Sequence, residues 1–142
     1  MTVIDSAKNK KSPSPWEGFR MGIAVILAFL IGIMSVISGS LVLLNYNIPN
    51  YNVVNWLVIY NVILGGISII AAIFIWKNTK STKKLIVEIL ILHLLVFVYL
   101  YFFSQEVALE SLKAMSFRIS IWIVIYLLTF KKISQKPLNI TK

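Results

Sequence analysis

The sequence predicts an all-α fold, a polytopic membrane protein built as an antiparallel four-transmembrane-helix bundle running up-down-up-down, with both termini cytoplasmic. Composition, long apolar runs and the distribution of positive charge lead to this prediction. The chain of 142 residues is 58% hydrophobic and only 13% charged, and its mean hydropathy of +0.85 is typical of membrane proteins. The apolar runs do not alternate with polar residues, so helices are favoured over membrane-spanning strands.

Four apolar runs are long enough to cross a hydrocarbon core of about 30 Å, which takes about 20 helical residues. The predicted spans are residues 21–44, 53–76, 85–103 and 112–130. We expect residues 1–15 to be a flexible basic cytoplasmic tail, residues 16–132 the transmembrane domain, and residues 133–142 a second basic cytoplasmic tail. The first run is too long for a signal-peptide core and has no small-residue cleavage pattern after it, so we expect it to be retained.

The three connections between the predicted spans are short. Residues 45–52 combine turn-forming asparagines and a proline with two tyrosines, residues 77–84 are polar and rich in lysine, and residues 104–111 carry Glu106 and Glu110. Short connections make consecutive helices antiparallel neighbours. An antiparallel bundle therefore follows from the connection lengths.

Positive charge is distributed unevenly along the chain. Twelve of the fourteen basic residues lie in three segments, with four in each: Lys8, Lys10, Lys11 and Arg20; Lys77, Lys80, Lys83 and Lys84; Lys131, Lys132, Lys136 and Lys142. The positive-inside rule places these segments in the cytoplasm. Because each cluster adjoins a span, the net charge of +9 indicates contact with the lipid bilayer rather than with nucleic acid.

The chain has no cysteine, which excludes disulfides, thiolate metal sites and thiol redox chemistry. Abundant lysine and isoleucine and the simple charge asymmetry are also typical of a bacterial-type inner membrane, where we expect a multi-pass protein. Composition leaves an organelle membrane open as the alternative.

Small residues recur at helical spacing in the first two spans. They are Gly32, Ser35 and Gly39 in the first span, and Gly65, Ser68 and Ala72 in the second. Each set forms one stripe, and small stripes let membrane helices approach closely. We expect the two stripes to face each other, with a homo-oligomer interface or a groove for a lipid tail as alternatives.

Arg118 is the most unusual residue of the fourth span. If that span ends at Phe130, Arg118 lies about 10 Å below the outer surface, where a guanidinium costs a few kcal/mol unless it snorkels, meets water or is paired. Asn61 and Ser38 are expected at a similar depth and, with Tyr60, predict a polar layer in the outer half of the bundle. Glu106 or Glu110 would neutralise the arginine if their connection folds inward.

Two interpretations of Arg118 follow. In the first, it lies in an outward-facing pocket and binds an anionic headgroup, a carboxylate or a quinone oxygen, for which its planar fork is well suited. In the second, it snorkels outward at the interface beside Trp122. The sequence leaves both open.

His93 is the only histidine and lies near the middle of the third span. Ionisable groups at this depth are candidates for proton relays, haem ligands or quinone contacts. A neutral histidine bonded to a nearby hydroxyl or carbonyl is the alternative. Haem would need a second axial ligand from another copy or subunit. Glu88 follows Lys84 by four residues, which predicts an ion pair.

No hydrolase serine elbow, phosphate loop, metal-ligand spacing or paired catalytic carboxylates occur in the chain, so no residue set proposes an enzyme. No diagnostic motif selects a family. The first functional hypothesis is a binding or accessory subunit whose outer polar pocket takes a lipid-like or anionic ligand, working with other membrane subunits or as a homo-oligomer. An oligomeric small transporter or channel is the second, and a membrane redox or enzyme subunit using His93 is the third.

Overall fold

The computed structural model describes residues 15–46, 54–103 and 109–130. This part of the chain forms four helices: α1 (Pro15–Leu43), α2 (Asn55–Trp76), α3 (Thr82–Phe103) and α4 (Leu109–Phe130). All four are long and apolar enough to cross a membrane. The predicted fold class is therefore confirmed, and the chain is a multi-pass integral membrane protein.

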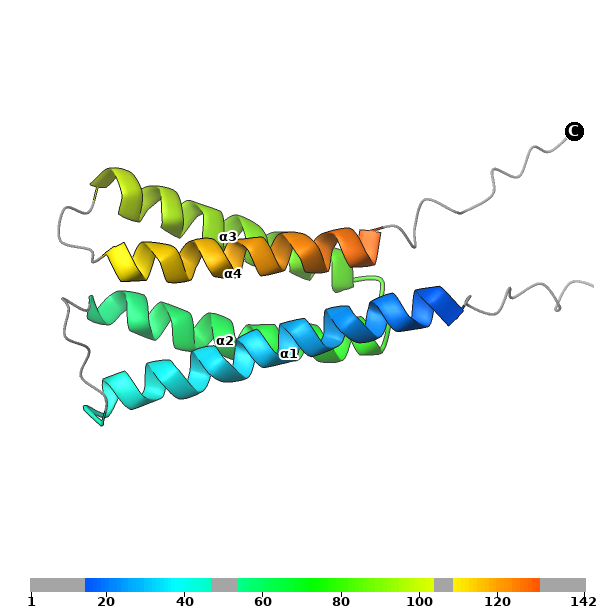
Figure 1. The fold of residues 1–142 in the computed structure, drawn as a ribbon, viewed down its shortest axis with the longest axis horizontal. Coiled ribbons are helices and arrows are strands. Elements are labelled where there is room, and N and C mark those ends of the chain that lie inside the picture. Colours follow the sequence, from blue (N-terminus) through cyan, green and yellow to red (C-terminus); the bar gives the residue numbers. More distant parts are fainter. Residues whose placement is uncertain (1–14, 47–53, 104–108, 131–142) are drawn as a thin grey trace, which may run out of the picture.

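Consecutive helices run antiparallel (Figure 1). Each helix packs against two others, in the order α1, α2, α3, α4 and back to α1, and the α1–α2 pair is the most extensive. The end of α1, the start of α2, the end of α3 and the start of α4 lie at one end of the bundle, which we call the two-loop end (Figure 1). The opposite end holds the α2–α3 connection, the start of α1 and the end of α4, and we call it the terminal end (Figure 1).

The helices begin at different residues from the predicted spans. α1 begins at Pro15 rather than at residue 21, and α3 and α4 each begin three residues early, at Thr82 and Leu109. The spans were delimited by apolar residues, but helical backbone continues through charged residues such as Lys84 and Glu110. Hydropathy therefore marks the part of each helix suited to lipid and not the full length of the helix.

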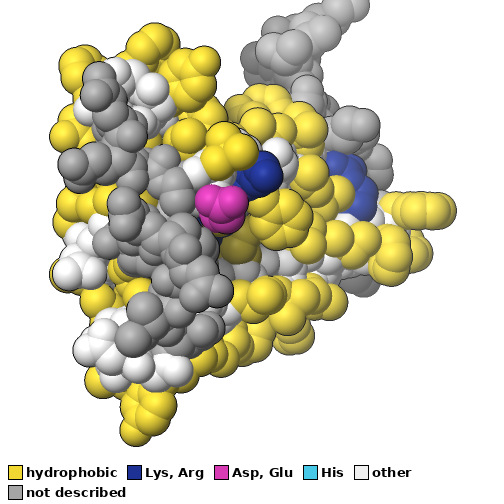
Figure 2. All heavy atoms as spheres, turned by 60° about the vertical axis from the view of Figure 1, so that its left-hand side comes forward, with side chains coloured by type: hydrophobic (Ala, Val, Ile, Leu, Met, Phe, Trp, Pro, Cys, Tyr) yellow, Lys and Arg dark blue, Asp and Glu magenta, His cyan; other side chains and the backbone are white. Residues whose placement is uncertain are grey.

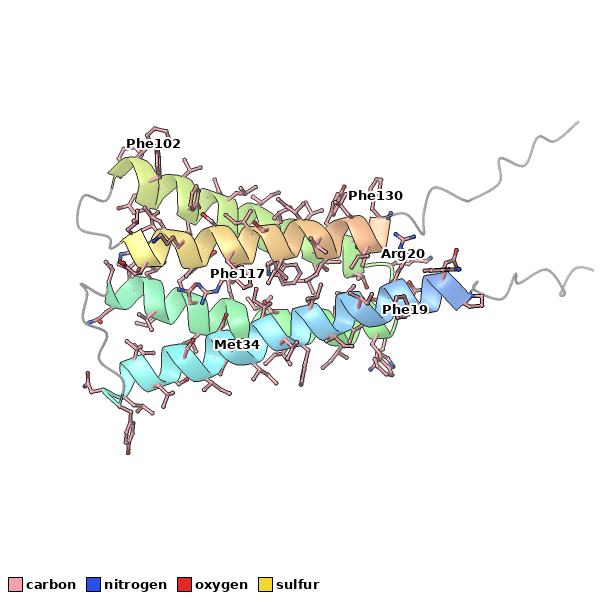
Figure 3. All side chains as sticks on the ribbon, in the orientation of Figure 1. Phe19, Arg20, Met34, Phe102, Phe117 and Phe130 are labelled. Carbon is pink, nitrogen blue, oxygen red and sulfur yellow. The ribbon has the colours of Figure 1, made fainter. Side chains whose placement is uncertain are left out.

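Small and aliphatic side chains fill the centre of the bundle around Trp122, which is fully buried. Many of the remaining large apolar side chains point outward, including Met34, Phe102 and Phe117 (Figure 3). Among the described residues visible in Figure 2, hydrophobic side chains cover most of the surface, with few charged groups among them. An apolar exterior around a packed interior is the arrangement expected of a protein surrounded by lipid.

The closest helix contact joins α1 and α2 at two glycines. A Cβ atom at Gly32 would lie 2.8 Å from the carbonyl oxygen of Gly65, and one at Gly65 would lie 2.9 Å from the carbonyl oxygen of Gly32 and from the Cβ of Ser35. Gly39 faces Val62 in the same interface. All six residues of the two small-residue stripes are buried, with Gly65 of the α2 stripe against Gly32 and Ser35 of the α1 stripe.

Side chains tie the helices together at the terminal end. Arg20 on α1 donates hydrogen bonds to the carbonyl oxygens of Leu127 and Leu128 near the end of α4, at 3.4 Å and 3.0 Å, and Figure 3 shows Arg20 close to Phe130. Thr82 at the start of α3 donates to the carbonyl of Phe74 on α2 at 2.8 Å. These bonds satisfy carbonyl groups that helix ends leave without a helical partner.

The glycine contact generates the first prediction. Gly65→Ala should destabilise the protein by about 1–3 kcal/mol, because the new methyl group meets backbone that cannot rotate away. Gly66→Ala is the matched control, since a Cβ there meets nothing within 4 Å. Unfolding in detergent, followed by circular dichroism, measures both. Equal stability of the two variants would contradict a close α1–α2 contact.

Candidate functional site

Polar side chains from all four helices meet in the half of the bundle nearer the two-loop end. We call this set the polar layer: Ser35 of α1, Tyr60 and Asn61 of α2, His93 of α3, and Arg118 of α4. Counted from the nearest helix ends at the 1.5 Å rise per residue, Ser35, Asn61, His93 and Arg118 lie about 9–15 Å deep. Their similar depth allows side chains of separate helices to meet.

Arg118 turns toward α1 inside the bundle. Its Nε donates a hydrogen bond to Ser35 Oγ at 3.3 Å, and the contact is partly buried. The described residues form one ion pair, between Lys84 and Glu88 at 3.7 Å, and the sequence spacing predicted it. Glu110 is exposed in the first turn of α4 and does not pair with Arg118; Glu106 lies outside the described residues. Ser35 is thus the polar partner that the described part of the chain gives Arg118.

A cavity of about 220 Å³ opens between α1, α2 and α4 toward the two-loop end; we call it the Arg118 cavity. Its lining residues are Ser35, Ser38, Gly39, Val42, Val54, Leu57, Val58, Asn61, Ser111, Ala114 and Arg118. Val42, Val54 and Ser111 lie near helix ends, so the cavity runs inward from there to Ser35, Asn61 and Arg118. It has mainly small and apolar walls and a polar inner end.

A smaller void lies deeper in the bundle, next to the inner end of the Arg118 cavity. It shares Ser35, Asn61 and Arg118 with that cavity and reaches His93 and Trp122. It holds no volume that a water molecule would occupy. The polar layer therefore closes the inner end of the Arg118 cavity.

Two buried polar atoms next to these spaces lack a hydrogen-bond partner among the described residues. They are Oδ1 of Asn61, an acceptor, and Nε1 of Trp122, a donor. Leaving a buried polar atom unpaired costs about 1–3 kcal/mol. Asn61 lines both the Arg118 cavity and the smaller void, and its Oδ1 is closed off from water in this arrangement.

His93 and Tyr60 form the part of the polar layer between α2 and α3. Tyr60 Oη and His93 Nδ1 are 3.1 Å apart, within hydrogen-bond distance, and His93 is 3% exposed. The alternative given for His93, a neutral histidine bonded to a nearby hydroxyl, has such a hydroxyl in Tyr60. Tyr60 does not line the Arg118 cavity, so it belongs to the layer through its contact with His93.

Serine hydroxyls differ in their relation to the cavity. Ser38 lines it, although the hydroxyl of Ser38 donates to the carbonyl of Met34 at 2.6 Å. Ser116 and Ser120 donate to carbonyls of their own helix and line neither space. Sequence reasoning assigned Ser35 to helix packing and did not identify it as the partner of Arg118. Its depth, close to that expected for Arg118, was the available signal.

Comparisons with protein-family models, with curated proteins and with solved structures found no match to this chain. The geometry of the polar layer and of the cavities is therefore what indicates a function for this chain.

The unpaired carbonyl of Asn61 generates the second prediction. Asn61→Leu should leave the free energy of unfolding unchanged or raise it, because leucine has similar size and removes an unsatisfied acceptor that costs about 1–3 kcal/mol. Tyr60→Phe should lower it by about 0.5–1.5 kcal/mol, because it removes the hydrogen bond to His93. Chemical denaturation in detergent measures both variants. Destabilisation by Asn61→Leu would mean that the amide has a stabilising partner.

Proposed function

We propose that this integral membrane protein is a binding or accessory subunit of a bacterial-type cytoplasmic membrane, and that the Arg118 cavity holds the anionic end of a lipid-like ligand. The observation that carries the proposal is the position of Arg118. Its guanidinium lies at the inner end of a cavity formed by three helices, and Ser35 is its hydrogen-bond partner there.

The charge of Arg118 favours an anion. A cation at this depth in a membrane costs a few kcal/mol, and an anionic ligand would offset that cost. The planar guanidinium presents two parallel N–H groups to a carboxylate or phosphate. The described lining of the cavity contains no acidic side chain that would compete for them.

Asn61 adds a second polar group at the same inner end of the cavity. Its amide both donates and accepts hydrogen bonds, and its Oδ1 is buried without a partner among the described residues. A ligand with a hydroxyl or amine donor next to its anionic group would satisfy both Arg118 and Asn61. A ligand with an anion alone would accept a hydrogen bond from the amide N–H group of Asn61 and leave its oxygen unpaired.

The walls of the cavity favour a ligand with an apolar body. Val42, Val54, Leu57 and Val58 lie between the inner end and the two-loop end. At about 220 Å³ the cavity is smaller than the usual range of about 300–1,000 Å³ for small-molecule sites. It therefore suits one end of an amphipathic molecule, with the remainder lying outside the cavity.

Transport and redox chemistry fit the same residues less well. The void that joins Arg118 to His93 has no room for water within one copy, so a permeation route would need several copies. His93 is buried, and its Nδ1 lies at hydrogen-bond distance from Tyr60. Binding at the Arg118 cavity requires neither an oligomer nor a rearrangement of His93.

We infer that the Arg118 cavity opens on the outer side of the membrane. The terminal end carries Lys77, Lys80, Lys83 and Lys84 near its connection and Arg20 on α1, whereas Lys113 is the basic residue described near the two-loop end. Basic residues concentrate on the cytoplasmic side of membrane proteins. The distribution supports cytoplasmic termini.

The role of Arg118 generates the third prediction. Native mass spectrometry of the protein released gently from its own membrane should detect a bound small molecule. Arg118→Glu should abolish that adduct, and Arg118→Lys should weaken it about tenfold or more, because hydrogen bonds to charged groups contribute about 1.5–3 kcal/mol.

Ser116→Ala is the matched control, because Ser116 lies on the same helix and bonds only the carbonyl of Leu112. Circular dichroism establishes that each variant is folded. A folded Arg118→Glu variant that keeps the adduct would refute the proposed site and support an outward-snorkelling arginine.

Orientation generates the fourth prediction. The chain has no cysteine, so a single introduced cysteine reports which side of the membrane it occupies. A membrane-impermeant maleimide applied to intact cells should label Tyr46→Cys at the two-loop end and spare Lys80→Cys at the terminal end. Permeabilised cells provide the control, in which both are labelled. The reverse pattern in intact cells would invert the topology.

A further inference from the structure

A second cavity lies at the terminal end, opposite the Arg118 cavity. It has a volume of about 400 Å³, and we call it the lysine cavity. Its lining residues are Met21, Asn78, Thr79, Lys80, Thr82, Lys83 and Thr129. We propose that it binds the phosphate group of an anionic phospholipid. The proposal does not depend on the function of Arg118.

The lining of the lysine cavity is positive. It includes two lysines and no acidic side chain among the described residues. It also contains the start of α3 at Thr82, where the N–H groups of Thr82 and Leu85 bond the carbonyls of Thr79 and Ser81. The N–H groups between them have no helical acceptor, and a helix N-terminus attracts anions through such groups and its dipole.

Negative partial charges nearby are already paired within the protein. Arg20 bonds carbonyls near the end of α4, and Thr82 bonds the carbonyl of Phe74 on α2. Thr129 donates to carbonyls of its own helix. These carbonyl groups are thus occupied by other donors, and neither lysine of the cavity lining forms an ion pair among the described residues.

Lys83 is held over an aromatic ring. Its Nζ lies 4.8 Å from the centre of the Phe130 ring on α4, a cation–π contact that leaves the ammonium charge and its N–H donors available. The exposed ion pair of Lys84 with Glu88 lies outside the cavity lining. Lys83 therefore lies over Phe130 beside the cavity, whereas Lys84 pairs with Glu88 outside it.

The position of the lysine cavity favours a lipid over free phosphate. Trp16, Phe19 and Trp76 are highly exposed at the same end of the bundle, and exposed aromatic residues at helix ends mark the membrane–water interface. The first turns of α1, with Phe19 and Arg20, extend along this end (Figure 3). A phosphate group at that depth belongs to a headgroup, and about 400 Å³ lies within the usual range for ligand sites.

The experiment reconstitutes the full chain in nanodiscs of phosphatidylcholine with or without phosphatidylglycerol. Native mass spectrometry then measures how many phosphatidylglycerol molecules remain bound. Lys80→Gln combined with Lys83→Gln should reduce retention about thirtyfold, because each lysine near an anionic headgroup contributes about 1 kcal/mol. The matched control combines Lys77→Gln with Lys84→Gln, which removes the same charge from the same connection but spares the cavity lining.

The outcomes separate a site from general charge. Loss of retention in the cavity variant alone supports the site, and equal retention in the two double variants overturns it, whether both lose the lipid or both keep it. Thermal unfolding in phosphatidylcholine alone tests folding, and Lys83→Arg, which keeps the charge, should retain the lipid if the double variant does not fold. Inorganic phosphate that displaces the lipid would support the same site with free phosphate as its ligand; failure to displace it supports a phospholipid.

Discussion

The close approach of α1 and α2 at Gly32 and Gly65 is the constraint on which the rest of the bundle depends. In lipid the hydrophobic effect does not hold helices together, so close packing must do so. Each of the two glycines leaves room for the carbonyl oxygen of the other. The same contact positions Ser35, whose Cβ faces Gly65. It therefore also positions the Ser35 hydroxyl that accepts the hydrogen bond from Arg118.

Different interactions hold the two ends of the molecule. At the terminal end, Arg20 joins α1 to α4 and Thr82 joins α3 to α2. Toward the two-loop end, α1 and α4 meet through the single described bond between Arg118 and Ser35, and the Arg118 cavity lies beside it. Because fewer side-chain hydrogen bonds join the helices at the two-loop end, less free energy would be lost if the helices moved apart there to admit a ligand.

The sequence predicted much of this arrangement because length and hydropathy specify membrane helices strongly. The sequence also predicted a similar depth for Arg118, Asn61 and Ser38, and all three line the Arg118 cavity. Rotation about each helix axis was less predictable, because these helices are apolar on nearly every face and a weak apolar stripe does not orient a helix. For that reason Ser35 was assigned to packing alone, and the contact of Tyr60 with His93 was not predicted, although Tyr60 was predicted in the polar layer.

The polar layer is hard to explain as a device for stability. A bundle that only had to fold would gain from leucine at Asn61, whose buried carbonyl has no described partner, and from an apolar residue in place of a partly buried cation. Residues that break the local rules of packing are expected at functional sites, where stability is given up for binding. In this protein Asn61 and Arg118 line the same inner end of one cavity. Two independent packing errors have no reason to converge on one space, whereas a ligand with an anionic group and an adjacent donor would require both.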